Sequence, residues 1–250
     1  MIEPVALEPL ISAVDVRKTF PGGRGQPPVP VLGGISLDVH AGEMVSVVGP
    51  SGSGKSTLLY CLSGLEPFES GSVSLAGQDL GSLRRGALAA LRRDRIGFVF
   101  QSFNLIPSLS ARENVALPAR LARRGASRHD IDAALAAVGL SDRAHHKPGK
   151  LSGGQQQRVA IARVLATRPD IVFADEPTGS LDTASGSEVL SLLREAANGG
   201  QAVIVVTHDL EAAALADRVL VLRDGVIHNE LRRPTPDQLL EEITRARLSA

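Results

Sequence analysis

Residues 49–56 join glycines, a lysine and a hydroxyl at a spacing that suits the binding of a phosphate chain. They read GPSGSGKS and match the pattern G-x-x-x-x-G-K-[ST] at every fixed position. Glycines let backbone N–H groups turn toward phosphate oxygens without a Cβ in the way, and the start of a following helix adds a positive dipole end. An ordinary glycine-rich turn would explain neither Lys55, a charge for the outer phosphates, nor Ser56, whose hydroxyl can ligate Mg²⁺. The predicted phosphate-binding residues are Gly49, Pro50, Ser51, Gly52, Ser53, Gly54, Lys55, Ser56 and Thr57.

Two adjacent carboxylates follow a second apolar run, at 171–174. Asp175 stands where it can hold Mg²⁺ through its water shell, and Glu176 is one residue further, where it can polarise an attacking water as a general base. The alternative is an acidic pair that only caps the end of a strand. The phosphate-binding pattern favours the catalytic interpretation.

Short apolar runs predict the strands that would position these groups. They lie at 45–48, 171–174, 202–206 and 219–222. Each run fits a strand buried on both faces, and helical patterns separate the runs, which indicates a parallel sheet flanked by helices. A membrane span needs about 20 apolar residues, so none of these runs is long enough to be one.

The remaining patterns predict three further parts. Glycine-rich turns separate the strands of a smaller antiparallel sheet, near 11–16, 31–39 and 72–75. Residues 21–30, PGGRGQPPVP, are predicted to be a loop. Helical patterns replace strand patterns from 104 to 165, which indicates a helical insertion. The last predicted element is an amphipathic helix at 235–248, with Leu239, Leu240 and Ile243 on one side.

Composition narrows the classes of partner. The 27 basic and 27 acidic residues cancel, so the chain is not expected to be a general binder of nucleic acid. The single Cys61 cannot form an internal disulfide, which fits a reducing compartment. Residues 1–9 lack a basic start and contain two glutamates and two prolines, so no export signal is predicted there.

A second glycine-rich segment, LSGGQ at 151–155, precedes a helical pattern at 156–167. Ser152 is a natural N-cap, and the glycines leave the helix start open to a closely approaching anion. The whole stretch 151–182, LSGGQQQRVAIARVLATRPDIVFADEPTGSLD, resembles the ATP-binding-cassette (ABC) ATPases. Their signature, LSGGQ, is followed closely by the acidic strand. The resemblance runs from about residue 11 to residue 228.

The resemblance implies roles for single residues outside the phosphate loop. Phe20 would stack on adenine, although a core aromatic is the alternative for this position. Gln101 would sense Mg²⁺ and the attacking water, and together with Ser56 and Asp175 it completes the expected metal site. Asp182 belongs to the SLD motif at 180–182, which matches the family's D-loop, and it is expected to be a nucleotide-binding residue. His208 would bind the γ-phosphate and orient Glu176.

In this family the signature acts on ATP held by a second subunit. The resemblance therefore implies a dimer of this chain with itself or a homologous ATPase, with two shared sites for ATP and Mg²⁺. The residues that would close on the partner's nucleotide are Ser152, Gly153, Gly154 and Gln155.

The resemblance also implies the fold. We expect an α/β P-loop NTPase core with a parallel sheet, an N-terminal antiparallel β subdomain and an inserted α-helical subdomain. Residues 1–103 and 166–228 would form the ATP-binding core, 104–165 the helical subdomain with the signature, and 229–250 a C-terminal helical tail.

A finer likeness lies at 97–115, where GFVFQSFNLIP is soon followed by LSARENV. These segments resemble a bacterial branch that holds ATPases of macrolide exporters, lipoprotein-releasing complexes, bacitracin-type resistance pumps and the cell-division FtsE type. There the ATPase pairs with an integral membrane permease subunit, so a peripheral location on the cytoplasmic face of the cell membrane is expected. Residues 103–115 would receive the permease's coupling helix; the alternative is that they only pack the helical subdomain.

The leading hypothesis is an ATPase that powers a membrane transporter by ATP-driven dimer closure, with the substrate recognised by the permease. A regulatory ATPase of cell division or the envelope, with no transported solute, would carry the same motifs. A soluble ABC ATPase of DNA repair or translation is disfavoured. Repair members insert a long coiled coil between phosphate loop and signature, translation members carry two cassettes, and this sequence has neither feature.

Overall fold

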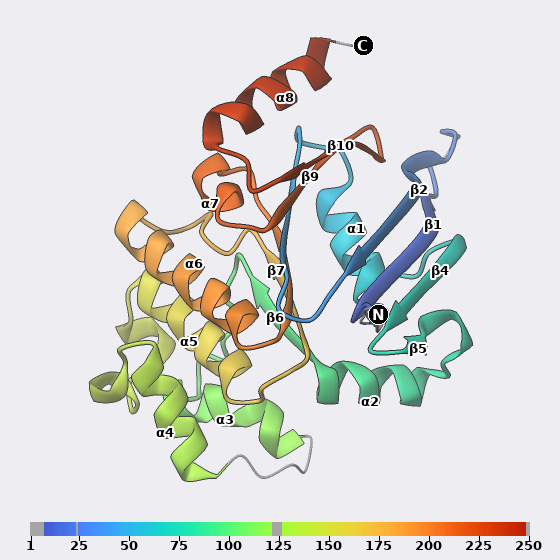
Figure 1. Ribbon diagram of the computed structural model, residues 1–250. Helices are drawn as coiled ribbons and strands as arrows, with labels where there is room; N and C mark the ends of the chain where they lie inside the picture. Colours follow the sequence, from blue (N-terminus) through green and yellow to red (C-terminus); the bar gives the residue numbers. More distant parts are fainter. Residues whose placement is uncertain (1–7, 24, 122–126, 249–250) are drawn as a thin grey trace, which may run out of the picture.

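Two β-sheets lie side by side in the computed structural model, which describes residues 8–23, 25–121 and 127–248 (Figure 1). The larger sheet has the strand order β10-β9-β3-β8-β7-β6. Strands β3 and β6 to β9 run parallel to their neighbours in this sheet, and β10 is antiparallel to β9. Its strands are β3 (Met44–Val48), β6 (Ile96–Phe100), β7 (Ile171–Asp175), β8 (Ala202–Val206), β9 (Arg218–Arg223) and β10 (Val226–Arg232). All four predicted apolar runs lie in it, and every residue of β3, β7 and β8 is buried, as expected for strands covered on both faces.

The smaller sheet is antiparallel, as predicted, with the order β2-β1-β4-β5. Its strands are β1 (Ile11–Phe20), β2 (Val29–Val39), β4 (Ser70–Leu75) and β5 (Gln78–Asp79). The predicted loop at 21–30 is wrong at its end, because Val29 and Pro30 already belong to β2 and pair with Phe20 and Thr19. Strand β2 is at the sheet edge, where proline is tolerated near the start of a strand because it removes few ladder hydrogen bonds.

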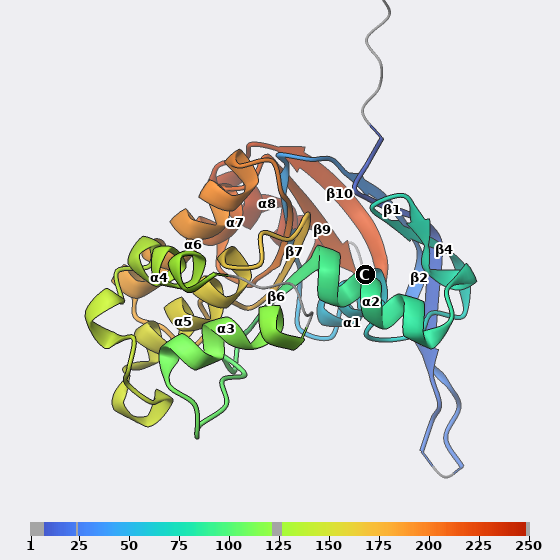
Figure 2. The same cartoon turned by 90° about the horizontal axis from the view of Figure 1, so that it is seen from below.

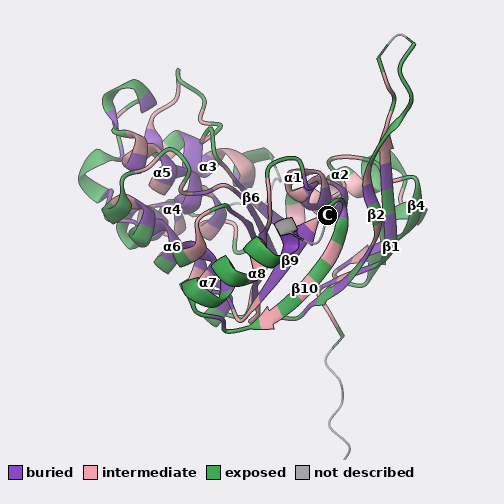
Figure 3. Cartoon of the chain, turned by 90° about the horizontal axis from the view of Figure 1, so that it is seen from above, coloured by how far each residue is buried: buried purple, intermediate pink, exposed green. Residues whose placement is uncertain are grey.

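Two apolar cores cover the two faces of the larger sheet. One contains side chains of the smaller sheet, of helix α1 (Lys55–Leu62) and of alternate strand positions such as Val45 and Phe173. The other contains the intervening positions, such as Val172, together with side chains of the helices after residue 110. Figure 3 shows the buried residues concentrated in the central strands and on the inward faces of the helices. Helix α1 thus connects the phosphate loop to the core between the two sheets.

Helices replace strands throughout the described part of 104–165, as the sequence indicates. This segment contains α3 (Ala111–Leu121), α4 (Arg128–Ala137), the short 3-10 helices η2 (Ser141–Arg143) and η3 (Pro148–Lys150), and α5 (Gly153–Leu165). Figure 2 shows these helices gathered with α6 (Thr183–Asn198) on one side of the larger sheet, opposite the smaller sheet. The predicted start of the signature helix at residue 156 is three residues late, because Ser152 caps the helix and Gly153 is already helical.

The remaining helices are η1 (Leu80–Ser82), α2 (Arg85–Arg95), α6 (Thr183–Asn198), α7 (Leu210–Ala214) and α8 (Pro236–Leu248). On α8, Leu239 is fully buried and Ile243 packs against the core one turn later. Leu240 is 56% exposed, so its predicted place on the apolar side is wrong. Adjacent helix positions differ by about 100° around the axis, whereas positions four apart share a face. Among the described residues, no helix combines the length and apolarity needed to cross a bilayer.

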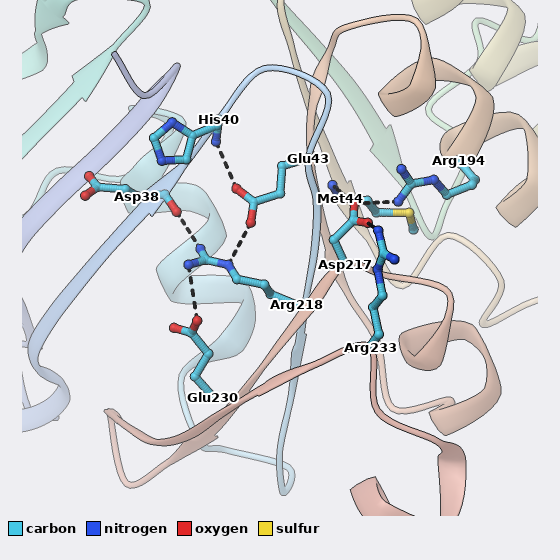
Figure 4. Close-up of polar contacts among 9 residues, drawn as sticks. All are labelled: Asp38, His40, Glu43, Met44, Arg194, Asp217, Arg218, Glu230 and Arg233. Atoms are coloured by element: carbon cyan, nitrogen blue, oxygen red, sulfur yellow. Dashed lines mark hydrogen bonds and ion pairs between the residues drawn. The ribbon is translucent and has the colours of Figure 1, made fainter. Parts of the chain in front are cut away.

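A polar cluster joins the larger sheet to its neighbours at the end where β3 begins, away from the phosphate loop (Figure 4). The Asp217 carboxylate accepts hydrogen bonds from the Met44 backbone (3.0 Å) and from Arg194 (2.6 Å), and these partners hold its pKa below the ordinary value against the opposing effect of burial. Beside it, Arg218 pairs with Glu43 at 2.8 Å. The residues drawn are Asp38, His40, Glu43, Met44, Arg194, Asp217, Arg218, Glu230 and Arg233.

Candidate active site

The phosphate loop runs from β3 to α1, and neighbouring backbone explains two of its glycines. Gly49 has φ 151° and Gly54 has φ 97°, conformations that other residues rarely adopt. A Cβ on Gly49 would lie 2.0 Å from the Leu222 carbonyl oxygen, and one on Gly54 would lie 2.8 Å from that of Val31. The backbone of β9 packs against Gly49 and that of β2 against Gly54, so only glycine fits at these two positions.

Lys55 folds back over this loop. Its Nζ donates hydrogen bonds of 2.9 Å to the carbonyl oxygens of Gly49 and Pro50. Burial lowers the pKa of Lys55 below 10.5, and the negative charges of Glu176 and Asp175 oppose that shift. The predicted cation and the predicted carboxylates, far apart in sequence, thus act on one another across the same site.

Asp175 ends β7 with only 9% of the residue exposed, and both of its carboxylate oxygens accept a hydrogen bond from α1. Ser56 Oγ donates to Oδ1 at 3.0 Å, and the Tyr60 hydroxyl donates to Oδ2 at 2.7 Å. Burial, and then the bond to Asp175, raise the pKa of Tyr60 to about 12. Sequence reasoning missed Tyr60, although its position one helical turn after Ser56 was a signal that could have identified it.

The oxygens of Ser56 and Asp175 suit Mg²⁺, a hard cation that binds one or two protein oxygens and takes further ligands from water and phosphate. Among the described residues, no group of three or more His, Cys, Asp and Glu side chains could hold a metal ion unaided. The residues present therefore fit a magnesium ion that arrives with a nucleotide.

Glu176 and His208 are in direct contact. His208 Nδ1 lies 2.8 Å from Glu176 Oε2, and the His208 backbone N–H donates to the same oxygen at 3.4 Å. Glu176 has φ 47°, a strained conformation for a residue with a side chain, and its N–H donates to the Val206 carbonyl at 2.8 Å. The end of β8 therefore holds Glu176 in place, with its Oε2 bonded to His208.

Gln101 directly follows β6 and is exposed at the same sheet edge as the acidic pair. Phe100, the residue before it, is the register partner of Asp175. A Cβ on Gly179 would lie 2.8 Å from Gln101 Nε2, and Ser180 Oγ donates to the Gln101 carbonyl at 3.5 Å. The predicted metal-sensing glutamine is therefore next to the loop that follows Glu176.

The signature segment begins α5 with a reciprocal cap. The Gln155 backbone N–H donates to Ser152 Oγ at 3.3 Å, and the Ser152 backbone N–H donates to Gln155 Oε1 at 3.0 Å. A Cβ on Gly154 would lie 2.6 Å from Ser185 Oγ, so the glycine allows α5 to approach the first turn of α6. Ser185 is held in turn by Asp182, which caps α6 and whose pKa these hydrogen bonds lower.

Two links therefore join the signature to the segment after Glu176 within one chain. Besides the contact at Gly154, the fully buried Gln157 of α5 donates from Nε2 to the Pro177 carbonyl at 2.7 Å. Sequence reasoning did not single out Gln157, although it lies inside the signature run. Between 152–155 and 49–57, both within the described chain, no hydrogen bond or ion pair is formed.

Phe20 ends β1 and is partly exposed. Lys18 Nζ lies 4.6 Å from the centre of its ring, and the same ammonium donates to the Pro67 carbonyl at 2.8 Å. Phe20 pairs with Val29 of β2, and Val31, two residues further, touches Gly54 of the phosphate loop. The Lys18 ammonium thus lies over one face of the Phe20 ring.

The comparisons with known proteins agree with this geometry. The model of the ABC transporter family matches residues 32–179, and the chain belongs to that family. It is similar to the pyoverdine export ATP-binding/permease protein PvdT of Pseudomonas aeruginosa, with 52% identity over 221 residues that cover 88% of this chain and 33% of that protein. It is also similar to the macrolide export ATP-binding/permease protein MacB of Escherichia coli, with 48% identity over 223 residues, 88% of this chain and 34% of that protein. The chain thus spans about a third of the length of these relatives.

Among solved structures, the chain is similar to the ATP-binding cassette MJ0796 in a dimeric post-hydrolysis state bound to ADP and Pi. The TM-score is 0.82 at 41% identity, and the match covers 90% of this chain and 99% of that one. The protein is therefore an ATP-binding cassette of the ATPase type. The family, fold class and ATPase class predicted from the sequence are confirmed, whereas the roles of single site residues remain predictions.

Proposed function

We propose that this chain is the ATP-hydrolysing motor of a membrane exporter and works by closure of two cassettes around ATP and Mg²⁺. The observation that carries the proposal is the division of the site. Lys55, Asp175, Glu176 and His208 act on one another beside the phosphate loop, whereas the signature at 152–155 makes no hydrogen bond or ion pair with 49–57 in the described chain. One cassette therefore holds the nucleotide, and a second must supply the signature.

The proposed chemistry assigns one task to each side chain at the phosphate loop. Lys55 leaves the carbonyl oxygens of the loop and binds the outer phosphates, while the N–H groups at the start of α1 bind their neighbours. Ser56 and Asp175 would hold Mg²⁺, which neutralises charge on the phosphates when bound. Glu176 accepts a proton from the attacking water at Oε1, because Oε2 is already bonded to His208.

Water then bonds to the γ-phosphorus, and the bond from that phosphorus to the bridging oxygen breaks to release ADP and phosphate. Ser152 of the second cassette would donate its O–H to the γ-phosphate. Its oxygen already accepts the cap bond from Gln155, but a hydroxyl keeps one donor for another partner. Closure is therefore tied to the presence of the γ-phosphate.

The proposed permease contact is a groove beside β6, the edge strand of the larger sheet. A cavity of about 320 Å³ lies there between β6, α2, α3 and α5. The stacked rings of Phe98 and Phe100, whose centres lie 5.5 Å apart, form part of its lining. Leu117 and Leu121 of α3 also line the cavity. The arginines that line it are Arg92, Arg93 and Arg163. This mixture of apolar and basic side chains suits an amphipathic helix that carries acidic groups.

In the predicted docking segment, 103–115, polar side chains form hydrogen bonds mainly within the segment itself. Asn114 is 1% exposed and donates to the carbonyl oxygens of Ile106 and Leu109, both at 3.2 Å. Glu113 binds Ser110 at the start of α3. These contacts favour the groove over the loop itself as the main docking surface, with Asn104 shared by both.

The permease would be an integral membrane protein, and this chain would bind it peripherally on the cytoplasmic face. The relatives are named ATP-binding/permease proteins for export, which favours transport over the regulatory alternative.

Glu176→Gln tests the motor. The amide keeps the size of the carboxylate but cannot accept the proton, so hydrolysis should fall by about 10²–10⁴-fold. Because ATP still binds, light scattering should find the variant dimeric with ATP and monomeric with ADP, and the wild type mainly monomeric. Ser152→Arg added to it should abolish the dimer. A variant that binds a fluorescent ATP analogue but stays monomeric would contradict shared sites.

Leu121→Glu tests the groove. Leu121 is 68% exposed, so the change should leave folding intact while it places a charge in the apolar lining of the groove. Leu240→Glu is the matched control, because Leu240 is 56% exposed on α8, outside the groove. Only Leu121→Glu should reduce recovery of the native membrane partner in pull-downs at unchanged basal ATPase activity. Equal recovery with both variants would place the permease contact elsewhere.

A further inference from the structure

Tyr60 reaches from α1 to the carboxylate that ends β7. Its hydroxyl donates to Asp175 Oδ2 at 2.7 Å, and Ser56, one helical turn earlier, donates to Oδ1 at 3.0 Å. The ring is partly buried and packs against the core between the two sheets. The two oxygens of Asp175 are therefore held by two hydroxyls from a single helix.

The hydroxyls of Ser56 and Tyr60 differ in their distance along α1 from the proposed nucleotide and metal site. Ser56 directly follows Lys55 at the start of α1, where the nucleotide and its metal would be bound. Tyr60 lies one helical turn further along α1, and its ring packs against the core between the two sheets. Its bond to Asp175 can therefore remain when Ser56 turns to a new partner.

We propose that Tyr60 is a positioning residue for magnesium, which fixes the orientation of the Asp175 carboxylate while Ser56 engages the metal. This inference rests on the proposed ATP and Mg²⁺ site. A carboxylate on a β-strand end can rotate about its last side-chain bond, and a hydrogen bond to one oxygen limits that rotation. Partners that orient a metal-binding group in this way typically contribute about 10–100-fold to metal affinity or activity.

Tyr60→Phe isolates this contribution, because it keeps the ring and its packing and removes one hydroxyl. Asp175 Oδ2 then loses its partner in a nearly buried place. Ser63→Ala is the matched control. It removes a hydroxyl just after the same helix, one that donates to the Tyr60 carbonyl at 3.1 Å and does not contact Asp175.

The first readout is the Mg²⁺ concentration that half-saturates binding of a fluorescent ATP analogue, and the second is the same concentration for hydrolysis. For Tyr60→Phe both should rise by about tenfold, whereas affinity for the analogue without Mg²⁺ should stay at the wild-type value. Ser63→Ala should keep the wild-type half-saturating concentrations. Thermal unfolding checks that both variants are folded.

A Tyr60→Phe variant with the same half-saturating Mg²⁺ concentration as Ser63→Ala would overturn the role of Tyr60. Wild-type protein whose nucleotide binding ignores Mg²⁺ would instead overturn the proposed magnesium site. Asp175→Asn provides the reference for complete loss of the effect, so the two failures are distinguishable.

Discussion

Two helices of the chain, α1 and α5, begin in glycine-rich segments, but only one of them has a side-chain N-cap. Helix α1 begins after Gly54, which offers no side-chain cap, so its first N–H groups are available to an anion. Helix α5 begins after Ser152, whose oxygen and the Gln155 side chain close a reciprocal cap. The start of α1 thus suits the proposed phosphate site, whereas the start of α5 is capped by side chains of its own chain.

The side chains around the start of α1 also differ from those around the start of α5. The phosphate loop has the proposed catalytic and metal-binding side chains of its own chain around it, including Asp175 bonded to Ser56. The signature instead packs on the start of α6 through Gly154 and Ser185. In the proposed function these regions are a nucleotide-binding half, around the phosphate loop, and a presenting half, around the signature. A second cassette, either a copy of this chain or a homologous ATPase, would join them.

Lys55→Ala should have the largest effect, because it removes the cation of the binding half. Loss of one preorganised charge-stabilising group typically lowers kcat by about 10²–10³-fold, and ATP affinity should fall with it. Steady-state hydrolysis at saturating ATP and Mg²⁺ measures the first effect, and titration with a fluorescent analogue measures the second. Near-normal turnover would mean that 49–56 is not the phosphate site.

Gly154→Ala should disturb the signature segment of the presenting half and leave the phosphate loop intact. The new Cβ would meet Ser185 Oγ at 2.6 Å, and Ser185 cannot retreat without weakening the α6 cap at Asp182. Overpacking of this kind costs about 1–3 kcal/mol. We expect ATP binding to persist, while hydrolysis and ATP-dependent dimerisation fall about tenfold.

Ser185→Gly removes the obstructing side chain and should restore part of the activity of Gly154→Ala. The measurement is a double-mutant cycle on kcat. If the two substitutions simply add, the contact between α5 and α6 does not position the signature.

Phe20→Ala should have a smaller effect, confined to binding. Stacking of a base on an aromatic ring contributes about 1–3 kcal/mol, and it acts on ground and transition states alike. The KM for ATP and for GTP should therefore rise by roughly tenfold while kcat changes little. An unchanged KM would favour the alternative, a ring that only packs beside Lys18.

Asp217→Asn should leave both halves intact and lower stability. Because Asp217 binds Arg194 and the Met44 backbone, we expect a loss of about 1–3 kcal/mol in the free energy of unfolding at neutral pH. The pKa of Asp217 is depressed below 3.8 in the folded chain, so this contribution is present above that pH. The wild-type advantage should shrink as the pH falls through the folded-state pKa, as measured by urea unfolding. An advantage that stays constant under acid conditions would contradict the role of the charge.

Most elements of the fold could be predicted because they depend on local patterns. The apolar runs become buried strands, the helical stretch after residue 104 is observed, and Ser152 caps a helix as its residue type suggests. The errors fall at element ends and at borderline positions, such as Pro30 inside β2 and Leu240 on the exposed side of α8. At such positions neighbouring strands or the exact helix face decide the outcome.

The sequence by itself determined the family, the phosphate loop, the acidic pair and the signature, because their residue types and spacings lie within short segments. Only the tertiary structure decided which side chains meet. Tyr60 bonds Asp175 across 115 positions of sequence, and Gln157 bonds the Pro177 carbonyl because α5 packs beneath the segment after β7. These contacts depend on the order in which strands assemble, with β3 beside β8 and β8 beside β7, and no local spacing specifies that order.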